Sequence, residues 1–320
     1  MSGRAWALFL ARRLIGTLVV VVILSAGVFT LLYLAPGSVE QTLLGTRPAS
    51  PESIAAIRVR YHLDESLPMQ YLRWLNGVFH GNFGTSIRAG GSVTDMIAAR
   101  LPLTLALAGY GTLLAIVTGL PLGIIGALRR GRSLDRGVVA ISIAGMSAPP
   151  FAVGLVLLLI FAVGLDWFPA YGTGTGFADQ LAHLTLPAAA IAIGAAGLLV
   201  RFTRTALVGQ LDQDYVVFAR ARGLSRRMVL GYAMRNSLIP ILTASGLILT
   251  TTLVGTVLVE VAFALPGLGS LLVDSVTFKD VPVVQALSLL LTLLIASINL
   301  LVDVAYAVVD PRIRFGAQPS

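Results

Sequence analysis

The apolar residues of this chain gather in long runs, separated by segments rich in arginine, glycine and proline. They do not alternate as in a half-buried strand, nor recur every three to four residues as on one face of a surface helix. A helix that crosses a bilayer needs about 20 apolar residues. The pattern therefore predicts an all-α membrane protein with six transmembrane helices. The predicted spans are residues 14–34, about 101–128, 138–165, 184–200, 238–265 and 283–309.

The first run is too long to be the core of a cleaved signal peptide. Residues 14–34 make 21 positions, whereas a signal-peptide core has about 7–15. We therefore expect a cytoplasmic segment at residues 1–13, followed by a first helix that stays in the membrane. The third run is unusual in a different way, because Ala148-Pro149-Pro150 interrupts it.

The composition supports the membrane prediction and excludes several chemistries. Hydrophobic residues make up 56% of the chain, charged residues 12%, and the mean hydropathy is +0.87, whereas soluble domains carry about 25% charged residues. A net charge of +8 would suggest nucleic acid for a soluble chain, but in a membrane protein it first indicates cytoplasmic loops. The sequence contains no cysteine, which excludes disulfides, thiolate nucleophiles and cysteine-held metals.

The distribution of Lys and Arg predicts the orientation, because cytoplasmic loops carry an excess of basic residues. The two ends of the chain and the loops after the second and fourth runs hold 16 of the 23 basic residues. Six of the others lie in one long loop, residues 35–100. We therefore expect both termini, including residues 311–320, in the cytoplasm and the long loop outside. Nucleic acid is not expected as a partner.

The long external loop has a helical pattern of its own. Ser50-Pro51 is typical of a helix start, and apolar residues follow on one face at Ile54, Ile57 and Tyr61. A second amphipathic segment begins near Pro68. The pattern fits a structured lid or docking platform, and it fits helices that lie on the lipid surface equally well.

An energy source for transport is hard to find within the chain. A P-loop needs a lysine after a glycine-rich run, but the single lysine, Lys279, follows Thr277-Phe278. Ion-coupled carriers usually keep ionisable residues deep in their spans, and the two candidates, Glu260 and Asp303, lie toward the ends of theirs. The chain is therefore not expected to be an ATPase, and an ion-coupled secondary carrier remains the alternative.

An intramembrane protease is a further alternative. The sequence lacks a His-Glu-x-x-His helix and facing aspartates, and no metal site is expected. Ser245 and His183 could be drawn as a dyad, although Ser245 beside Gly246 fits close helix packing better. Small residues that permit close packing, within one bundle or between two chains, recur at Gly119, Gly123, Gly126, Gly194 and Gly197.

The fifth predicted span carries several hydroxyl side chains. They are Thr243, Ser245, Thr250, Thr251, Thr252 and Thr256. Such groups could line a hydrated path, or they could donate back to carbonyls of the preceding turn. The pattern allows a path without requiring one.

The cytoplasmic segment at residues 201–237 is the most informative part of the sequence. The pattern from Asp214 onward predicts a short basic helix that ends at Gly223, a residue able to adopt positive φ, and a new helix that starts at Leu224-Ser225. Such a knob can dock in a groove of a partner protein. It can also be an ordinary basic loop that fixes the topology.

These residues resemble the membrane permease subunit of binding-protein-dependent ABC importers, in the dipeptide, oligopeptide and nickel branch. Ala219 and Gly223 match the alanine, three residues, glycine signature of that family, and Arg235–Pro240 matches the Arg-Asn-x-Leu-Ile-Pro stretch of this branch. The chain has Val217-Phe218 where the general signature has Glu-Ala, a departure typical of the peptide branch. Further matches, in order, are Arg100–Leu105, Pro149–Phe151, Glu260, Pro266–Gly269 and Asp310–Arg312.

The resemblance implies a type I importer permease fold with a core at residues 101–310. In that family a short cytoplasmic helix docks on a separate ATP-hydrolysing subunit, and the permease itself performs no catalysis. It implies no cofactor in this chain, since ATP and Mg²⁺ would be bound by partner subunits. The implied partners are a second homologous permease, one or two ABC ATPase subunits, an external substrate-binding protein and the lipid bilayer of the inner membrane.

Two groups of candidate residues follow. The expected contact with the ATPase consists of Phe218, Ala219, Arg220, Ala221, Arg222, Gly223 and Leu224. The candidates for an outer gate or path are Glu260, Pro266, Gly267 and Gly269. We expect the chain to form half of a path for dipeptides, oligopeptides or a similar small polar solute. A nickel complex, glutathione or a sugar stays open as the solute, and a nonenzymatic membrane receptor stays open as a rival class.

Overall fold

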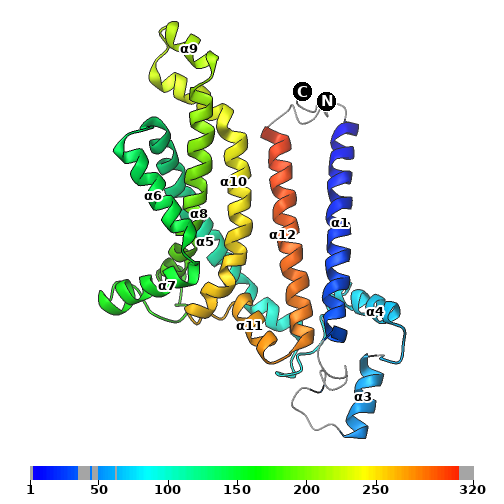
Figure 1. Ribbon diagram of the computed structural model, residues 1–320. Helices are drawn as coiled ribbons and strands as arrows, with labels where there is room; N and C mark the ends of the chain where they lie inside the picture. Colours follow the sequence, from blue (N-terminus) through cyan, green and yellow to red (C-terminus); the bar gives the residue numbers. More distant parts are fainter. Residues whose placement is uncertain (1–2, 35–43, 45–49, 62, 310–320) are drawn as a thin grey trace. The chain divides into compact units, whose positions relative to one another are not determined.

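The computed structural model describes residues 3–34, 44, 50–61 and 63–309 (Figure 1). Within these residues the chain is helical, with turns, loops and one isolated bridge between Thr85 and Ser92. The helices are α1 (Gly3–Leu34), α3 (Pro51–Tyr61), α4 (Leu67–Phe79), α5 (Val93–Leu128), α6 (Ser133–Ser147), α7 (Pro150–Leu157), the π-helix η1 (Leu158–Gly164), α8 (Phe177–Leu211), α9 (Asp214–Ala221), α10 (Arg226–Ala262), α11 (Leu268–Thr277) and α12 (Val281–Val309). The predicted all-helical class is confirmed.

Five of these helices are long and apolar enough to cross a membrane. The apolar segments lie in Ala11–Thr30, Val93–Leu128, Phe177–Leu211, Arg226–Ala262 and Val281–Ala305. A sixth span exists only if α6 and the helix that follows it count as one, although the two are bent by 104° at their junction. Five of the predicted spans coincide with these helices, and the third, residues 138–165, falls on the bent pair, whose break lies at Ala148-Pro149-Pro150 as the sequence indicated.

The paired prolines explain the break between α6 and α7. Proline has no backbone N–H and disfavours helical geometry in the residue before it. Ala148, before Pro149, is extended at φ −85° and ψ 128°, and Pro149 itself is extended at φ −59° and ψ 132°. The helix consequently stops at Ser147 and restarts at Pro150, where proline is well tolerated as a first helical residue.

The chain divides into two compact units, which are described separately. The first unit consists mainly of Leu105–Leu265, and the second of Ala7–Thr104 with Pro266–Ser297. In the first unit, α8 packs against α6, α7 and α10. A buried cluster joins α5, α8 and α10 through Ala115, Ala192, Ala195, Leu199, Ala244 and Ile248.

Glycines allow the helices of the first unit to approach each other closely. A Cβ added at Gly197 in α8 would lie 2.6 Å from the Ser142 carbonyl oxygen in α6, and one at Gly123 in α5 would lie 2.7 Å from Thr203 Cβ in α8. Such distances leave no room for a methyl group. The expected close contacts of small residues therefore occur between helices of this chain. Dimerisation is not needed to explain these small residues.

The second unit is built around α1, α4, α11 and parts of α5 and α12. The hydroxyl groups of Ser25 in α1 and Tyr71 in α4 lie 2.7 Å apart, and the ring centroids of Phe29 and Trp74 lie 5.8 Å apart. Asp280, just before α12, accepts hydrogen bonds from the Ser86 hydroxyl and from the backbone N–H of Ile87 at 3.0 Å. These contacts fix the end of the long loop onto the α11–α12 turn.

Several element boundaries differ from the sequence prediction. The segment 201–237 is largely helical, because α8 continues to Leu211 and α10 begins at Arg226. The Pro266–Gly269 segment, whose proline and glycines favour a turn, leads directly into α11, a helix that the sequence did not predict. The helices expected within the long loop are present as α3 and α4, and the Asp310–Arg312 motif lies outside the described residues.

Candidate functional site: the helix between α8 and α10

The short helix α9 ends in a specific hydrogen-bonded turn. The Leu224 N–H donates to the Ala219 carbonyl at 3.1 Å, and the Gly223 N–H donates to the Arg220 carbonyl at 3.0 Å. With Gly223 at φ +75°, this is the Schellman arrangement, in which a left-handed residue follows the helix cap. The spacing of Ala219 and Gly223 therefore has a physical cause, since the two positions are the carbonyl acceptor and the left-handed residue of one turn.

The next helix begins immediately, which makes α9 a compact knob between two long helices. The Ser225 hydroxyl accepts a hydrogen bond from the Met228 N–H at 3.4 Å and caps α10. Val216 anchors α9 because its side chain is completely buried. The predicted end of one helix at Gly223 and start of the next at Ser225 are confirmed.

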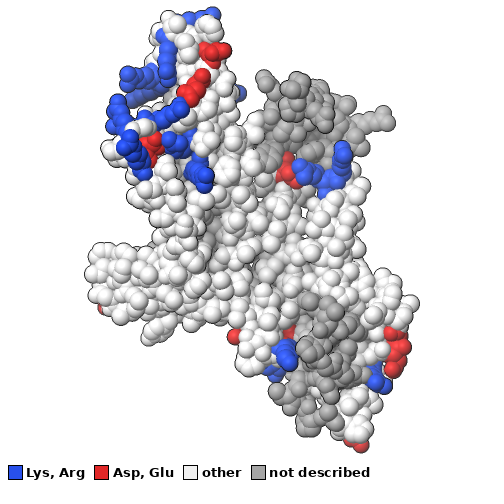
Figure 2. Space-filling view, in the orientation of Figure 1, with Lys and Arg blue, Asp and Glu red and all other residues white. Residues whose placement is uncertain are grey.

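The knob presents apolar and basic side chains outward. Val217 is 60% exposed and Phe218 67% exposed, while Arg220, Ala221, Arg222 and Gly223 are exposed and Ala219 and Leu224 are half-buried. Figure 2 shows the basic residues of the first unit gathered at the end that carries α9 and the α5–α6 turn. An exposed phenylalanine amid arginines is the composition of a protein contact, because aromatic residues and arginine are enriched at such interfaces.

An ion pair ties the base of this knob to the neighbouring helices. Arg204 in α8 donates from Nε to Asp135 Oδ1 at 2.6 Å and from Nη2 to Oδ2 at 2.8 Å. The Gly131 N–H of the α5–α6 turn donates to the same carboxylate at 2.8 Å. Asp135 is only 4% exposed. This bidentate pair, called here the Asp135–Arg204 clamp, joins α6 to α8 about two turns before α8 ends at Leu211.

A second ion pair joins the same two regions at the surface. Arg130 in the α5–α6 turn lies 2.6 Å from Asp212, which follows α8, and both side chains are more than half exposed. Exposed pairs contribute little to stability. The buried clamp is therefore the stronger connection between the α5–α6 turn and the end of α8.

The candidate gate residues are distributed over both units. Glu260, in the last turn of α10, is completely buried, and its backbone carbonyl accepts from the Leu265 N–H at 2.8 Å. Pro266 is exposed, whereas Gly267 and Gly269 are buried at the start of α11. There the Leu268 N–H donates to the Thr104 hydroxyl at 2.8 Å, so a side chain of α5 caps α11.

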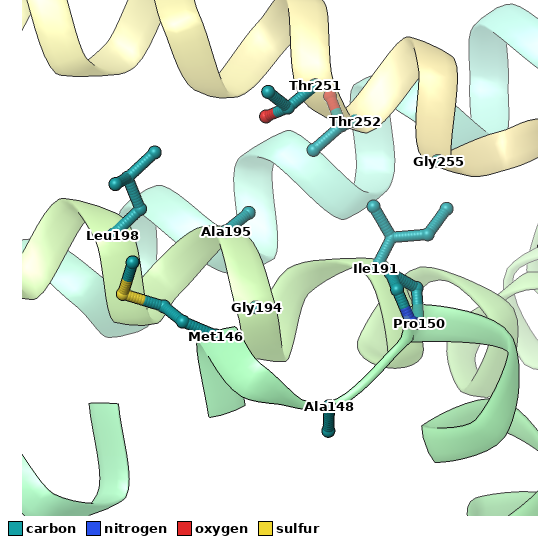
Figure 3. A pocket seen from close by; sticks show the side chains of 10 residues that line it. All are labelled: Met146, Ala148, Pro150, Ile191, Gly194, Ala195, Leu198, Thr251, Thr252 and Gly255. Carbon is teal, nitrogen blue, oxygen red and sulfur yellow. The ribbon is translucent and has the colours of Figure 1, made fainter. Parts of the chain in front are cut away.

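The hydroxyl groups of α10 donate back to their own helix. Ser245 donates to the Ile241 carbonyl at 2.9 Å, and Thr251 donates to the Ile248 carbonyl at 3.0 Å. Thr252 additionally lies 2.8 Å from the Thr112 hydroxyl in α5. Thr251 and Thr252 line a cavity of about 250 Å³ between α10, α8 and the α6–α7 break (Figure 3).

Comparison with known proteins decides the family. The model of the family described as "Binding-protein-dependent transport system inner membrane component" matches residues 119–315, and the model of its N-terminal region matches residues 7–108. The chain belongs to this family. It is thus a membrane permease component of an ABC importer and not the ATPase.

Relatives match this permease over almost its whole length. It is 38% identical over 308 residues to the glutathione transport system permease protein GsiC of Salmonella paratyphi A, covering 96% of this chain and 99% of that protein. It is 36% identical over 316 residues to the oligopeptide transport system permease protein AppB of Bacillus subtilis, covering 97% and 100%. These names describe the relatives.

A solved structure shows the same fold. A chain of the methionine ABC transporter MetNI, in an inward-facing conformation, aligns with a TM-score of 0.55 at 19% sequence identity. The alignment covers 67% of the permease and 96% of that chain. The type I importer fold expected from the resemblance is therefore supported at the level of overall architecture.

Sequence reasoning identified the knob of the permease but missed the Asp135–Arg204 clamp. Arg204 is one of the basic residues after the fourth apolar run, which serve only to predict the orientation, and Asp135 follows a cluster of arginines without any motif. An acidic residue in the first turn of a membrane helix, opposite an arginine inside an otherwise apolar helix, is the signal that could have revealed the pair. Within the described residues, no group of three His, Cys, Asp or Glu side chains is placed to hold a metal ion.

Proposed function

We propose that this permease forms half of the translocation path of an ABC importer for short peptides or a similar small polar solute. It crosses the inner membrane six times with both termini in the cytoplasm, and the residues between α1 and α5 form an external loop. ATP is hydrolysed by one or two separate ABC subunits. A second homologous permease supplies the other half of the path, and an external binding protein delivers the solute.

The observation that carries this proposal is the knob formed by α9 and its Schellman turn. It exposes Phe218 and Val217 beside arginines at the charged end of the first unit (Figure 2). Complete burial of a phenylalanine side chain stabilises a protein or complex by about 1.5–3 kcal/mol relative to leaving that side chain in water. A partner that buries Phe218 recovers this free energy, so Phe218, Ala219, Arg220, Ala221, Arg222, Gly223 and Leu224 are proposed to contact the ATPase.

The rest of the first unit provides a way to transmit movement from the knob. A ligand shifts a conformational equilibrium only by making different contacts in the two states. Closure of the ATPase subunits would act on α9, and the Asp135–Arg204 clamp would carry the displacement to α6 and its break. Glu260 and the residues Pro266, Gly267 and Gly269 are proposed as parts of an outer gate.

The solute class is supported by the relatives. Proteins named as glutathione and oligopeptide permeases match at 36–38% identity over nearly the full length. Glutathione is itself a peptide, so both names point to solutes with peptide groups. No finding favours an ion-coupled carrier, and the Ser245 hydroxyl donates to its own helix, as expected for a packing residue.

The test of the coupling contact compares two exposed phenylalanines, one in α9 and the other at the first residue of α8. Phe218 is 67% exposed in the knob, and Phe177 is 80% exposed at the first residue of α8. Tagged permease with Phe218→Ala should retain less ATPase subunit on affinity purification from native membranes. Removing an aromatic anchor commonly costs 2 kcal/mol or more, which is about thirtyfold in affinity.

The permease with Phe177→Ala should retain the ATPase like the unsubstituted protein. Both variants should reach the membrane in equal amount, because neither side chain is buried. Equal recovery of the ATPase with Phe218→Ala and the unsubstituted permease would contradict the proposed contact. Recovery of no ATPase with the unsubstituted permease would contradict the proposed function.

A further inference from the structure

A cavity in the first unit lies at the break between α6 and α7. It is bounded by Met146, Ala148 and Pro150 on the broken span, by Ile191, Gly194, Ala195 and Leu198 on α8, and by Thr251, Thr252 and Gly255 on α10. Figure 3 shows the Met146 and Leu198 side chains on one side and Thr251 and Thr252 across from Ala195. All of these residues belong to the first compact unit.

The prolines leave main-chain acceptors without their usual donors beside this cavity. In a helix the carbonyl of residue i accepts from the N–H of residue i+4. For Gly145 and Met146 those positions are Pro149 and Pro150, which have no N–H. Interrupted backbone at membrane depth is tolerated where it is buried in protein or lines a hydrated cavity, and carriers use such broken helices to bind solutes.

The polar groups around the cavity are neutral. Its lining contains no charged side chain, and the hydroxyl groups of Thr251 and Thr252 already donate to carbonyls of their own helix. A hydroxyl that donates one hydrogen bond can still accept others through its lone pairs. The cavity therefore offers hydrogen-bond acceptors set among apolar side chains, which complements a neutral group that donates hydrogen bonds.

Small residues keep the cavity open. Gly194, Ala195 and Gly255 contribute little or no side-chain volume from two helices. The cavity volume of about 250 Å³ falls below the 300–1,000 Å³ typical of sites that enclose a drug-sized ligand. It suits one residue or a few atoms of main chain from a longer solute.

We propose that this cavity is a subsite of the translocation path that accepts a main-chain segment of the peptide, with the solute's amide N–H groups facing the break and Thr251. The inference rests on the proposed function and specifies where the solute is held within this permease. A neutral subsite selects the peptide group that all peptides share, so side-chain selection falls to other parts of the importer.

A second cavity in the same unit serves as an internal comparison. It has a volume of about 340 Å³ between α5, α6 and α8, and its lining is dominated by Leu114, Leu122, Ile141, Ile193 and Val200. Ile141 is 73% exposed, yet the helix around it is unbroken. This surface matches lipid chains rather than a polar solute.

The absence of cysteine from the sequence permits a direct test. In the complex purified from native membranes and placed in vesicles, Thr251→Cys and Ile141→Cys each give this chain a single thiol. We expect a charged methanethiosulfonate reagent to modify the cysteine at 251, and to modify the cysteine at 141 about a hundredfold more slowly, because charge is excluded from hydrocarbon. Trialanine, supplied together with the binding protein and MgATP, should slow modification at 251 severalfold.

Two results would overturn the subsite. One is a cysteine at 251 that reacts as slowly as the one at 141, and the other is a fast reaction that trialanine leaves unchanged while the same vesicles accumulate trialanine. The comparison of the modification rates at 251 and 141 does not depend on transport. It therefore tests whether water reaches the cavity, separately from whether the permease imports peptides. Absence of ATP-driven trialanine uptake by the unsubstituted complex, with Thr251→Cys still reactive, would instead count against peptides as the solute.

Discussion

At the scale of single residues, packing rather than backbone freedom explains most of the glycines in the membrane helices. Gly197 and Gly209 both lie in α8, but their surroundings differ. A Cβ at Gly197 would lie 2.6 Å from the Ser142 carbonyl oxygen, whereas a Cβ at Gly209 would meet nothing within 4 Å. Gly197 therefore allows α6 and α8 to approach closely. Gly209 makes no such contact, and there glycine only makes the helix less stable than alanine would.

Substituting these two glycines should change stability in opposite directions. Gly197→Ala should lower the free energy of unfolding by about 1–3 kcal/mol, because the methyl group forces α6 and α8 apart. Gly209→Ala should leave stability unchanged or raise it by up to about 1 kcal/mol, since alanine is the better helix former. Thermal unfolding of the purified permease in detergent measures both. Equal effects of the two substitutions would show that the α6–α8 contact is looser than described.

At the scale of elements, the Asp135–Arg204 clamp determines how α6 and α8 move with the knob. Two side-chain hydrogen bonds of 2.6 and 2.8 Å join the helices, and the Gly131 N–H adds a third to the same carboxylate. The bonds are directional and Asp135 is buried, so α6 and α8 are held in one relative position near the base of α9. The 104° break beyond Ser147 lies at the far end of α6, where displacement of this helix would alter the cavity.

Removing the charge of Asp135 should lower the free energy of unfolding far more than removing the charge of Asp212. Asp135→Asn leaves Arg204 partly buried without its carboxylate, and breaking buried pairs costs about 3–5 kcal/mol. Because the Arg204 side chain is 26% exposed, we expect a loss near the lower end of that range. Asp212→Asn breaks the exposed pair with Arg130 and should change stability by less than about 1 kcal/mol.

The measurement for this pair is thermal unfolding together with the amount of solute imported per ATP hydrolysed. Asp135→Asn should lower both the unfolding temperature and the import ratio. Asp212→Asn, which removes a charge from the same region, should preserve both. An Asp135→Asn variant as stable and as well coupled as the unsubstituted importer would contradict the role given to the clamp.

At the scale of the whole molecule, the sequence predicts those features that the bilayer imposes. Long apolar runs locate α1, α5, α8, α10 and α12, because hydrocarbon requires a minimum apolar length. The turn at Gly223 that terminates α9 is also predictable, since a left-handed turn favours glycine.

Other features depend on contacts between distant residues, and the sequence pattern does not report them. Hydropathy marks only the apolar part of a helix, so it missed the extension of α8 to Leu211, and it did not show that the helix starting after Ser225 continues without a break to Ala262. The paired prolines predicted an interruption without its angle. Arg204 and Asp135 are 69 positions apart, and their pairing depends on how α6 and α8 pack. Pro266 and the two nearby glycines favour a turn, although the Thr104 hydroxyl accepts from the Leu268 N–H and lets a helix start there.

The central claim is that this permease moves solute only when a separate ATPase acts on it. The most direct measurement compares vesicles that contain the whole complex purified from native membranes with vesicles that contain this permease alone. The complex with its binding protein and MgATP should accumulate trialanine, and the permease alone should accumulate none under an imposed proton or sodium gradient. Accumulation by the permease alone, driven by either gradient and independent of ATP, would contradict the claim and identify an ion-coupled carrier.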